Sequence, residues 1–83
     1  MVSEQTLAVS KAGKEIYESR LKTELEARHL HQFVAIEPVS GEFFLGSTLS
    51  TAIQAARTAF PNRISFALRV GHEAAVHLGE LST

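Results

Sequence analysis

The sequence predicts a small α+β domain in which a β-hairpin, a helix and a third strand follow one another between residues 33 and 70. Three patterns carry this prediction: two apolar runs separated by Ser40-Gly41, an apolar stripe at helical spacing from Leu49 to Phe60, and strict alternation from Ile64 to Val70. We expect a mainly antiparallel sheet of three to four strands, with one helix packed on a face and an N-terminal helix before the hairpin.

Length and composition indicate one small domain and exclude several kinds of chemistry. The chain has 83 residues, 45% of them hydrophobic, and a formal net charge of −1. This length holds one small core, whose stability margin is thin unless the domain self-associates. The sequence has no cysteine, so it offers no disulfide, thiol nucleophile or thiolate ligand. Charges of both signs are spread evenly, so no basic patch indicates nucleic-acid binding.

The beginning of the sequence, Met1 to Thr6, lacks the basic and apolar regions of a secretion signal. No apolar run has the length of a membrane span. We therefore expect a cytoplasmic protein without a membrane partner.

The N-terminal part divides at Gly13. Residues 1–13 are interpreted as a flexible N-terminal arm, or as a short helix that orders only against a partner, because this glycine interrupts any helix that begins before it. Residues 14–83 form the expected single α+β domain. It begins with a helix from Lys14 to about Arg28, which contains no proline or glycine and has a narrow apolar stripe: Ile16, Tyr17, Leu21 and Leu25.

The hairpin follows this helix. Phe33 to Glu37 is rich in β-branched and aromatic residues, and Pro38 ends the strand because it has no N–H to donate. Ser40-Gly41 supplies the positive φ of a tight turn, and Glu42 to Leu45 returns antiparallel.

The second helix and the third strand complete the sheet. Thr48 is the candidate N-cap of a helix from Leu49 to Phe60. A right-handed crossover then places the third strand beside the first and gives the strand order 2-1-3. Residues 72–79 are interpreted as a short fourth strand or an extended tail.

The two faces of this sheet differ in the size of their side chains. Ile64, Phe66, Leu68 and Val70 are expected on the face that meets the Leu49–Phe60 helix. The other face, with Ala35 and Ala67, is expected to lack cover.

Five short segments occur together in this chain, followed by Ala74, Ala75 and Gly79: Glu15-Ile16-Tyr17, Phe33-Val34-Ala35-Ile36, Ser40-Gly41-Glu42, Phe60-Pro61-Asn62 and Arg69-Val70-Gly71-His72. The combination resembles a family of small uncharacterised bacterial proteins, a resemblance that implies no activity. The hairpin-helix-strand unit is also distantly similar in topology to the partial-RNase-H-like domain of HicB-type antitoxins, which binds a toxin. The chain lacks the helix-turn-helix or ribbon-helix-helix segment that those antitoxins use on DNA.

The four histidines are the candidate metal ligands. His29 and His31 form an H-x-H pair that can chelate an ion, but no carboxylate or cysteine accompanies them at ligand spacing. We interpret them as surface residues at a helix end. His72 and His77 face opposite ways on a strand and are not expected to share an ion.

Carboxylates and serines offer little for catalysis. The sequence has no aspartate and no Gly-x-Ser-x-Gly elbow. Glu37 and Glu42 flank the hairpin turn and are interpreted as solvated side chains without the burial that shifts a pKa. We therefore predict no catalytic residue, no metal ligand and no cofactor.

Three residues are the candidate partner contacts: Arg69, His72 and Phe44. Arg69 lies on the polar face of the third strand beside Ser65 and forms a compact polar group with Gly71 and His72. The alternative interpretation of Arg69 is a surface salt bridge. Phe44 belongs to hairpin aromatics without basic neighbours, which disfavours an RNA-binding sheet and favours core and interface.

These patterns predict a non-enzymatic module that forms a homodimer and binds a protein partner through the uncovered sheet face or an edge strand. Two alternatives stay open. One is an antitoxin-like regulator that binds a toxin or DNA. The other is a small histidine-dependent hydrolase or metal-binding protein.

Overall fold

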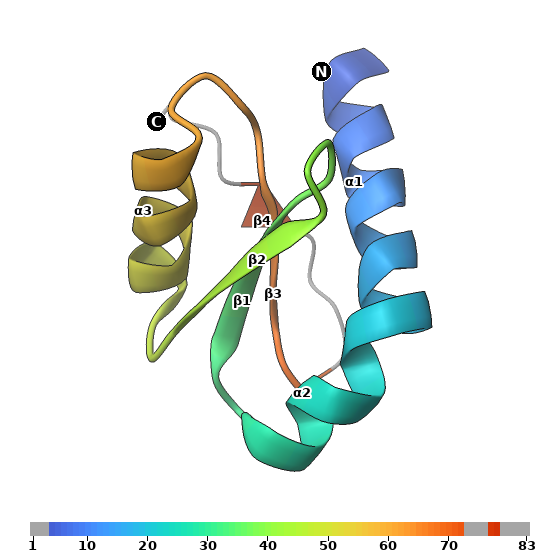
Figure 1. Ribbon diagram of the computed structural model, residues 1–83, viewed down its shortest axis with the longest axis vertical. Helices are drawn as coiled ribbons and strands as arrows, with labels where there is room; N and C mark the ends of the chain where they lie inside the picture. The colour runs from blue at the N-terminus through green and yellow to red at the C-terminus, as the bar shows by residue number, and fades with distance from the viewer. Residues whose placement is uncertain (1–3, 73–76, 79–83) are drawn as a thin grey trace.

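A small sheet lies between two helical layers in the computed structural model, which describes residues 4–72 and 77–78 (Figure 1). Helix α3 (Leu49–Ala59) covers one face of the sheet. On the other face, helix α1 (Glu4–Ile16) continues into the π-helix η1 (Tyr17–Leu21) and helix α2 (Lys22–Arg28). The α+β prediction is confirmed.

The sheet contains strands β1 (Phe33–Glu37), β2 (Glu42–Gly46), β3 (Phe66–Arg69) and β4 (His77–Leu78). Its order is β2-β1-β3-β4, and every neighbouring pair is antiparallel. The predicted order 2-1-3 is therefore confirmed, and the two residues of β4 add a short fourth strand beside β3. Residues 73–76 and 79 of the expected strand or tail lie outside the described residues.

Local signals fixed the turns and caps as expected. Gly41 has a φ of 78° in the hairpin turn, a region that glycine adopts readily. Thr48 is the N-cap of α3, and its hydroxyl accepts a hydrogen bond of 3.1 Å from the Thr51 N–H.

None of the helices that the structure describes has the length and apolar character needed to span a membrane.

The first helix begins earlier than the sequence predicted. It includes Glu4 to Gly13 and passes through the glycine without a break, so the expected start at Lys14 is wrong. Gly13 is buried, and a Cβ at this position would collide with the Phe66 side chain. The glycine allows α1 to approach β3 closely and does not end the helix. The flexibility of residues 1–13 stays a prediction.

The assignment of the two sheet faces is also wrong. The large side chains of β3, Phe66 and Leu68, pack with Val34 and Ile36 against Tyr17 of η1 and against α2, whereas α3 packs on Ala35 and Ala67 through its own Ala52 and Ala56. An alanine-lined helix matches an alanine-lined face, because small side chains on both sides let the two backbones approach. The face expected to lack cover lies under α3, and Ser65 is buried with it.

Candidate functional site

The structure brings two of the three predicted contact residues together and separates the third. Arg69 ends β3, and the His72 N–H donates a 3.2 Å hydrogen bond to the Arg69 carbonyl. Both side chains are exposed. Phe44 is half-buried in β2, where its ring meets Phe60 at a centroid distance of 6.2 Å. Phe44 therefore contributes to the packing beside α3, and the polar group at the end of β3 is a separate surface.

A histidine from another part of the chain joins this polar group. Nδ1 of His31 lies 2.7 Å from Nε2 of His72, and the two rings meet edge to face with centroids 4.9 Å apart. Arg69 donates from Nε to the His31 carbonyl at 3.0 Å, and its guanidinium lies over the Phe33 ring. We call His31, Arg69 and His72 the polar cluster.

Backbone geometry holds the two histidines in register. The Val70 N–H donates to the Gln32 carbonyl at 2.7 Å, and the His31 N–H donates to the Val70 carbonyl at 3.0 Å. His31 has a φ of 74°, an unusual conformation for a residue other than glycine. The chain therefore enters β1 through a tight turn that faces the end of β3.

The charge state of the polar cluster follows from its neighbours. Partial desolvation, the charge of Arg69 and the neighbouring His31 together lower the pKa of His72 below its usual range. His72 is therefore mainly a neutral imidazole at pH 7. A neutral imidazole can accept a hydrogen bond or ligate a metal ion through one nitrogen.

A cleft of about 470 Å³ opens beside His72, between η1, α2 and β3. Within this cleft, the Tyr17 hydroxyl donates a hydrogen bond of 3.4 Å to Glu26. Burial raises the pKa of Tyr17, and the nearby Glu26 charge raises it further. A hydrogen bond with the Gly71 backbone lowers this pKa, but the net shift is upward. Two lysines and two glutamates line the same walls: Lys14, Lys22, Glu18 and Glu26. Because these charges balance, the cleft has no preference for a ligand of one sign.

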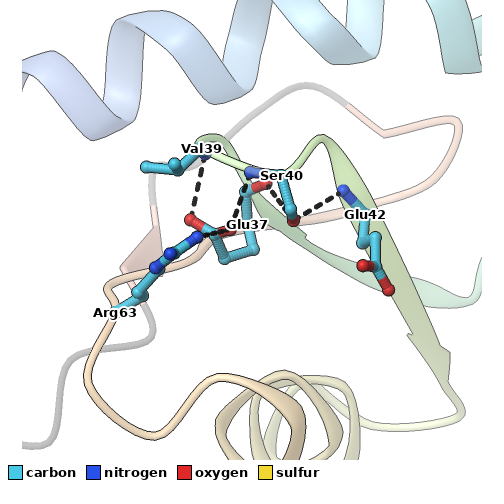
Figure 2. A network of polar contacts seen from close by, with 5 residues as sticks. All are labelled: Glu37, Val39, Ser40, Glu42 and Arg63. Carbon is cyan, nitrogen blue, oxygen red and sulfur yellow. Dashed lines mark hydrogen bonds and ion pairs between the residues drawn. The ribbon is translucent and has the colours of Figure 1, made fainter.

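The hairpin turn at the other end of β1 is built around a buried carboxylate (Figure 2). Glu37 is only 1% exposed, and its two carboxylate oxygens accept hydrogen bonds from the N–H groups of Val39 at 3.0 Å and Ser40 at 2.8 Å. Arg63 adds an ion pair at 3.1 Å. The prediction of a solvated glutamate pair is wrong for Glu37, although Glu42 opposite is exposed.

These donors decide the charge of Glu37. Burial alone raises the pKa of the carboxyl, but the hydrogen bonds from Val39, Ser40 and Arg63 lower it more, so the net shift is downward. The carboxylate stays ionised and fixes the loop between the strands. It has no room for a substrate, and we assign it a structural role.

Strand β2 forms the edge of the sheet. Among the residues that the structure describes, β1 alone pairs with β2, which is drawn at the front of the sheet in Figure 1. Phe43 of this strand is 39% exposed and Val39 of the adjoining turn is 75% exposed. The strand contains no lysine and no proline, two residues that natural proteins use to protect sheet edges.

Sequence analysis missed the pairing of His31 with His72 because it compared histidines close together in sequence. These two are 41 residues apart. The pairing could have been inferred from the predicted strand order 2-1-3. With the first and third strands antiparallel, the start of the first strand lies beside the end of the third. The π-helix at Tyr17–Leu21 has no signal that we can identify in the sequence.

Comparisons of the chain with models of protein families, with curated proteins and with solved structures found no match. The resemblances to small bacterial proteins and to HicB-type antitoxins stay predictions.

Proposed function

We propose that this protein is a self-associating interaction module without catalytic activity, in which strand β2 pairs with β2 of a second copy. The observation that supports the proposal is the edge position of β2, which carries the exposed Phe43 and no protecting lysine or proline. Pairing of two edges would extend the sheet across a two-fold axis. The uncovered face expected from the sequence is covered by α3, which leaves the edge as the route to association.

The backbone groups available at this edge follow from the hydrogen bonds of β1. In an antiparallel sheet, alternate residues of a central strand bond to either neighbour. Gln32 bonds to Val70 on the β3 side, so the odd-numbered residues of β1 bond to β2. Their partners are Glu42, Phe44 and Gly46. Phe43 and Leu45 therefore direct their N–H and C=O groups outward.

One register satisfies these groups without bringing like charges together. With Phe44 opposite Phe44 of the second copy, each Phe43 bonds to a Leu45, and each Glu42 lies opposite a Gly46. A register centred on Phe43 would bring Glu42 opposite Phe44 and leave Leu45 to pair with Gly41 in the turn. We therefore favour the register centred on Phe44, which uses the full strand.

The edge is held ready for pairing by the hairpin turn. The Glu37 carboxylate fixes Val39 and Ser40, and the Ser40 hydroxyl accepts from the Glu42 N–H at 3.1 Å (Figure 2). A strand that is already ordered loses little conformational freedom when it binds.

A charge placed at the edge tests the proposal. Phe43→Lys introduces a desolvation cost and like-charge repulsion at the paired edge, so the variant is expected to be a monomer under conditions where the wild type is a dimer. Light scattering coupled to size exclusion measures the mass of both. Leu7→Lys is the matched control, because Leu7 is 58% exposed on helix α1 and belongs to no strand, so its replacement is expected to leave the dimer intact.

Single cysteines test the register, since the chain has no cysteine of its own. Phe44→Cys is expected to cross-link on oxidation, because directly opposed residues of a non-hydrogen-bonded pair have Cα atoms about 4.5 Å apart. Leu45→Cys is expected to stay uncross-linked, because its copies are diagonal neighbours beyond about 7 Å. A wild type that stays a monomer at high concentration, or cross-linking through Leu45→Cys alone, would contradict this function.

A further inference from the structure

We propose that His31 and His72 form a binding site for a divalent transition-metal ion that prefers imidazole ligands, with Zn²⁺ as its representative. The site lies at the end of the sheet where the chain enters β1 and leaves β3. It uses no backbone group of the β2 edge, so it stands independently of the proposed self-association.

The distance between the two nitrogens is the first support. Nδ1 of His31 and Nε2 of His72 face each other at 2.7 Å. Two Zn–N bonds of 2.0–2.1 Å at a tetrahedral angle place the nitrogens about 3.3 Å apart. Both side chains are exposed, so the rings can separate by this small amount and turn until both lone pairs point at one ion, without disturbing the core.

The second support is the preorganisation of the two imidazoles. The His31 N–H and carbonyl are bonded to Val70 and to the Arg69 side chain, and the His72 N–H is bonded to the Arg69 carbonyl. On the neighbouring side, Leu30 packs so closely on Gly71 that a Cβ there would collide with it. The two ligands are therefore fixed at one place by a shared set of contacts. The φ of 74° at His31 is a conformation that histidine adopts more readily than most residues other than glycine.

Protons and the Arg69 charge are what a metal ion must compete with at this site. Metal ligation requires neutral imidazoles, so the ion must displace the proton of the hydrogen bond between His31 and His72. The Arg69 guanidinium, whose positive charge opposes a cation, is held over the Phe33 ring, 5.4 Å from the centroid.

The expected affinity is modest, because the protein supplies two ligands and water completes the coordination. Within residues 4–72 and 77–78, no cluster of three or more histidine, cysteine or acidic side chains could hold a metal ion. Imidazole ligands favour Cu²⁺, Ni²⁺ and Zn²⁺ over Mg²⁺ and Ca²⁺, which prefer oxygen. The site should therefore discriminate between these two groups of ions.

Titration of the full chain with zinc chloride tests the proposal. Binding to the folded state raises the melting temperature in a saturable manner, and the imidazole NMR signals of His31 and His72 are expected to shift while those of His29 do not. Magnesium chloride at the same ionic strength is expected to produce neither effect.

Three variants assign the effect to the two histidines. His31→Asn retains a side chain that tolerates positive φ, and His72→Gln retains a polar side chain, so both are expected to fold. Each should weaken zinc binding at least about tenfold, since even outer-sphere partners of a metal site contribute about 10–100-fold to affinity. His29→Asn should bind as the wild type does. Absence of saturable zinc binding, wild-type affinity in His31→Asn or His72→Gln, or an equal loss in His29→Asn would overturn the proposal.

Discussion

Strand β1 runs through the middle of the sheet in Figure 1, and a group of polar side chains lies at each of its two ends. The two groups differ in which side-chain atoms their hydrogen bonds leave free. At the hairpin end, the Glu37 carboxylate is buried and its oxygens are occupied by Val39, Ser40 and Arg63. At the opposite end, the His31 and His72 rings are exposed and bonded only to each other among the described residues. Backbone hydrogen bonds between the start of β1 and Val70 hold the local structure at this end.

This difference separates a structural role from a binding role. A buried charge whose partners are all internal stabilises the fold and has no capacity for a ligand. A pair of exposed imidazoles held by their backbone can exchange the bond between them for a bond to an ion. We therefore expect changes at Glu37 to act on stability and changes at the polar cluster to act on binding and protonation.

Replacement of the buried carboxylate should have the largest effect on folding. Glu37→Gln keeps the shape but presents an amide NH₂ to at least one of the N–H donors that the carboxylate accepts from, Val39 or Ser40. An unsatisfied buried donor costs about 1–3 kcal/mol, and the free energy of unfolding should fall by that amount. Urea denaturation at pH 7 measures it.

The control for this variant lies directly across the hairpin. Glu42 is the register partner of Glu37, but it is exposed. Glu42→Gln should therefore change the free energy of unfolding by no more than about 0.5 kcal/mol. Equal effects of the two substitutions would show that the Glu37 network does not stabilise the turn.

Acid should remove the contribution of Glu37 gradually. The folded state holds the pKa of this carboxyl below the ordinary value of 4.5, so the unfolded state binds the proton more tightly. The contribution is complete above pH 4.5 and is lost as the pH falls through the lower folded pKa. The stability difference between wild type and Glu37→Gln should thus be constant from pH 7 to about pH 5.5 and shrink below pH 4.5. A constant difference down to the acid transition would contradict the assignment.

Sequence patterns predicted the elements of this fold where the signals were local. The positive φ of Gly41, the N-cap at Thr48 and the stop at Pro61 each depend on a few neighbouring residues, and the elements beside them lie where expected. The strand order followed from connection handedness, which depends on no side-chain detail.

Long-range packing was beyond these patterns. Gly13 was interpreted through its helix propensity, but its place in the helix is decided by the Phe66 side chain of a distant strand. The wrong assignment of the two sheet faces also results from long-range packing. Alternation in β3 shows which residues share a face, but not which helix covers it. Matching the alanines of α3 to Ala35 and Ala67 would have given the correct assignment.

Among the candidate site residues, too, the local relationships were predicted and the long-range contacts were missed. Sequence analysis selected Arg69 and His72 as neighbours along the chain, and these residues do lie together. It placed His31 with His29, because no local pattern reports a contact across 41 residues. Its interpretation of Glu37 as solvated failed because burial of this side chain depends on Arg63 and on the fold of the turn.

The smallest expected effect is a change in the protonation of His72. After partial desolvation, the Arg69 charge lowers the pKa of His72 more than His31 does. Arg69→Gln should therefore raise that pKa toward the ordinary value of 6.5, and His31→Asn should raise it less. An NMR titration of the imidazole signals measures both, with Arg57→Gln on α3 as a control that leaves the pKa unchanged. If the pKa of His72 were the same in all three variants, the polar cluster would not determine the protonation of His72.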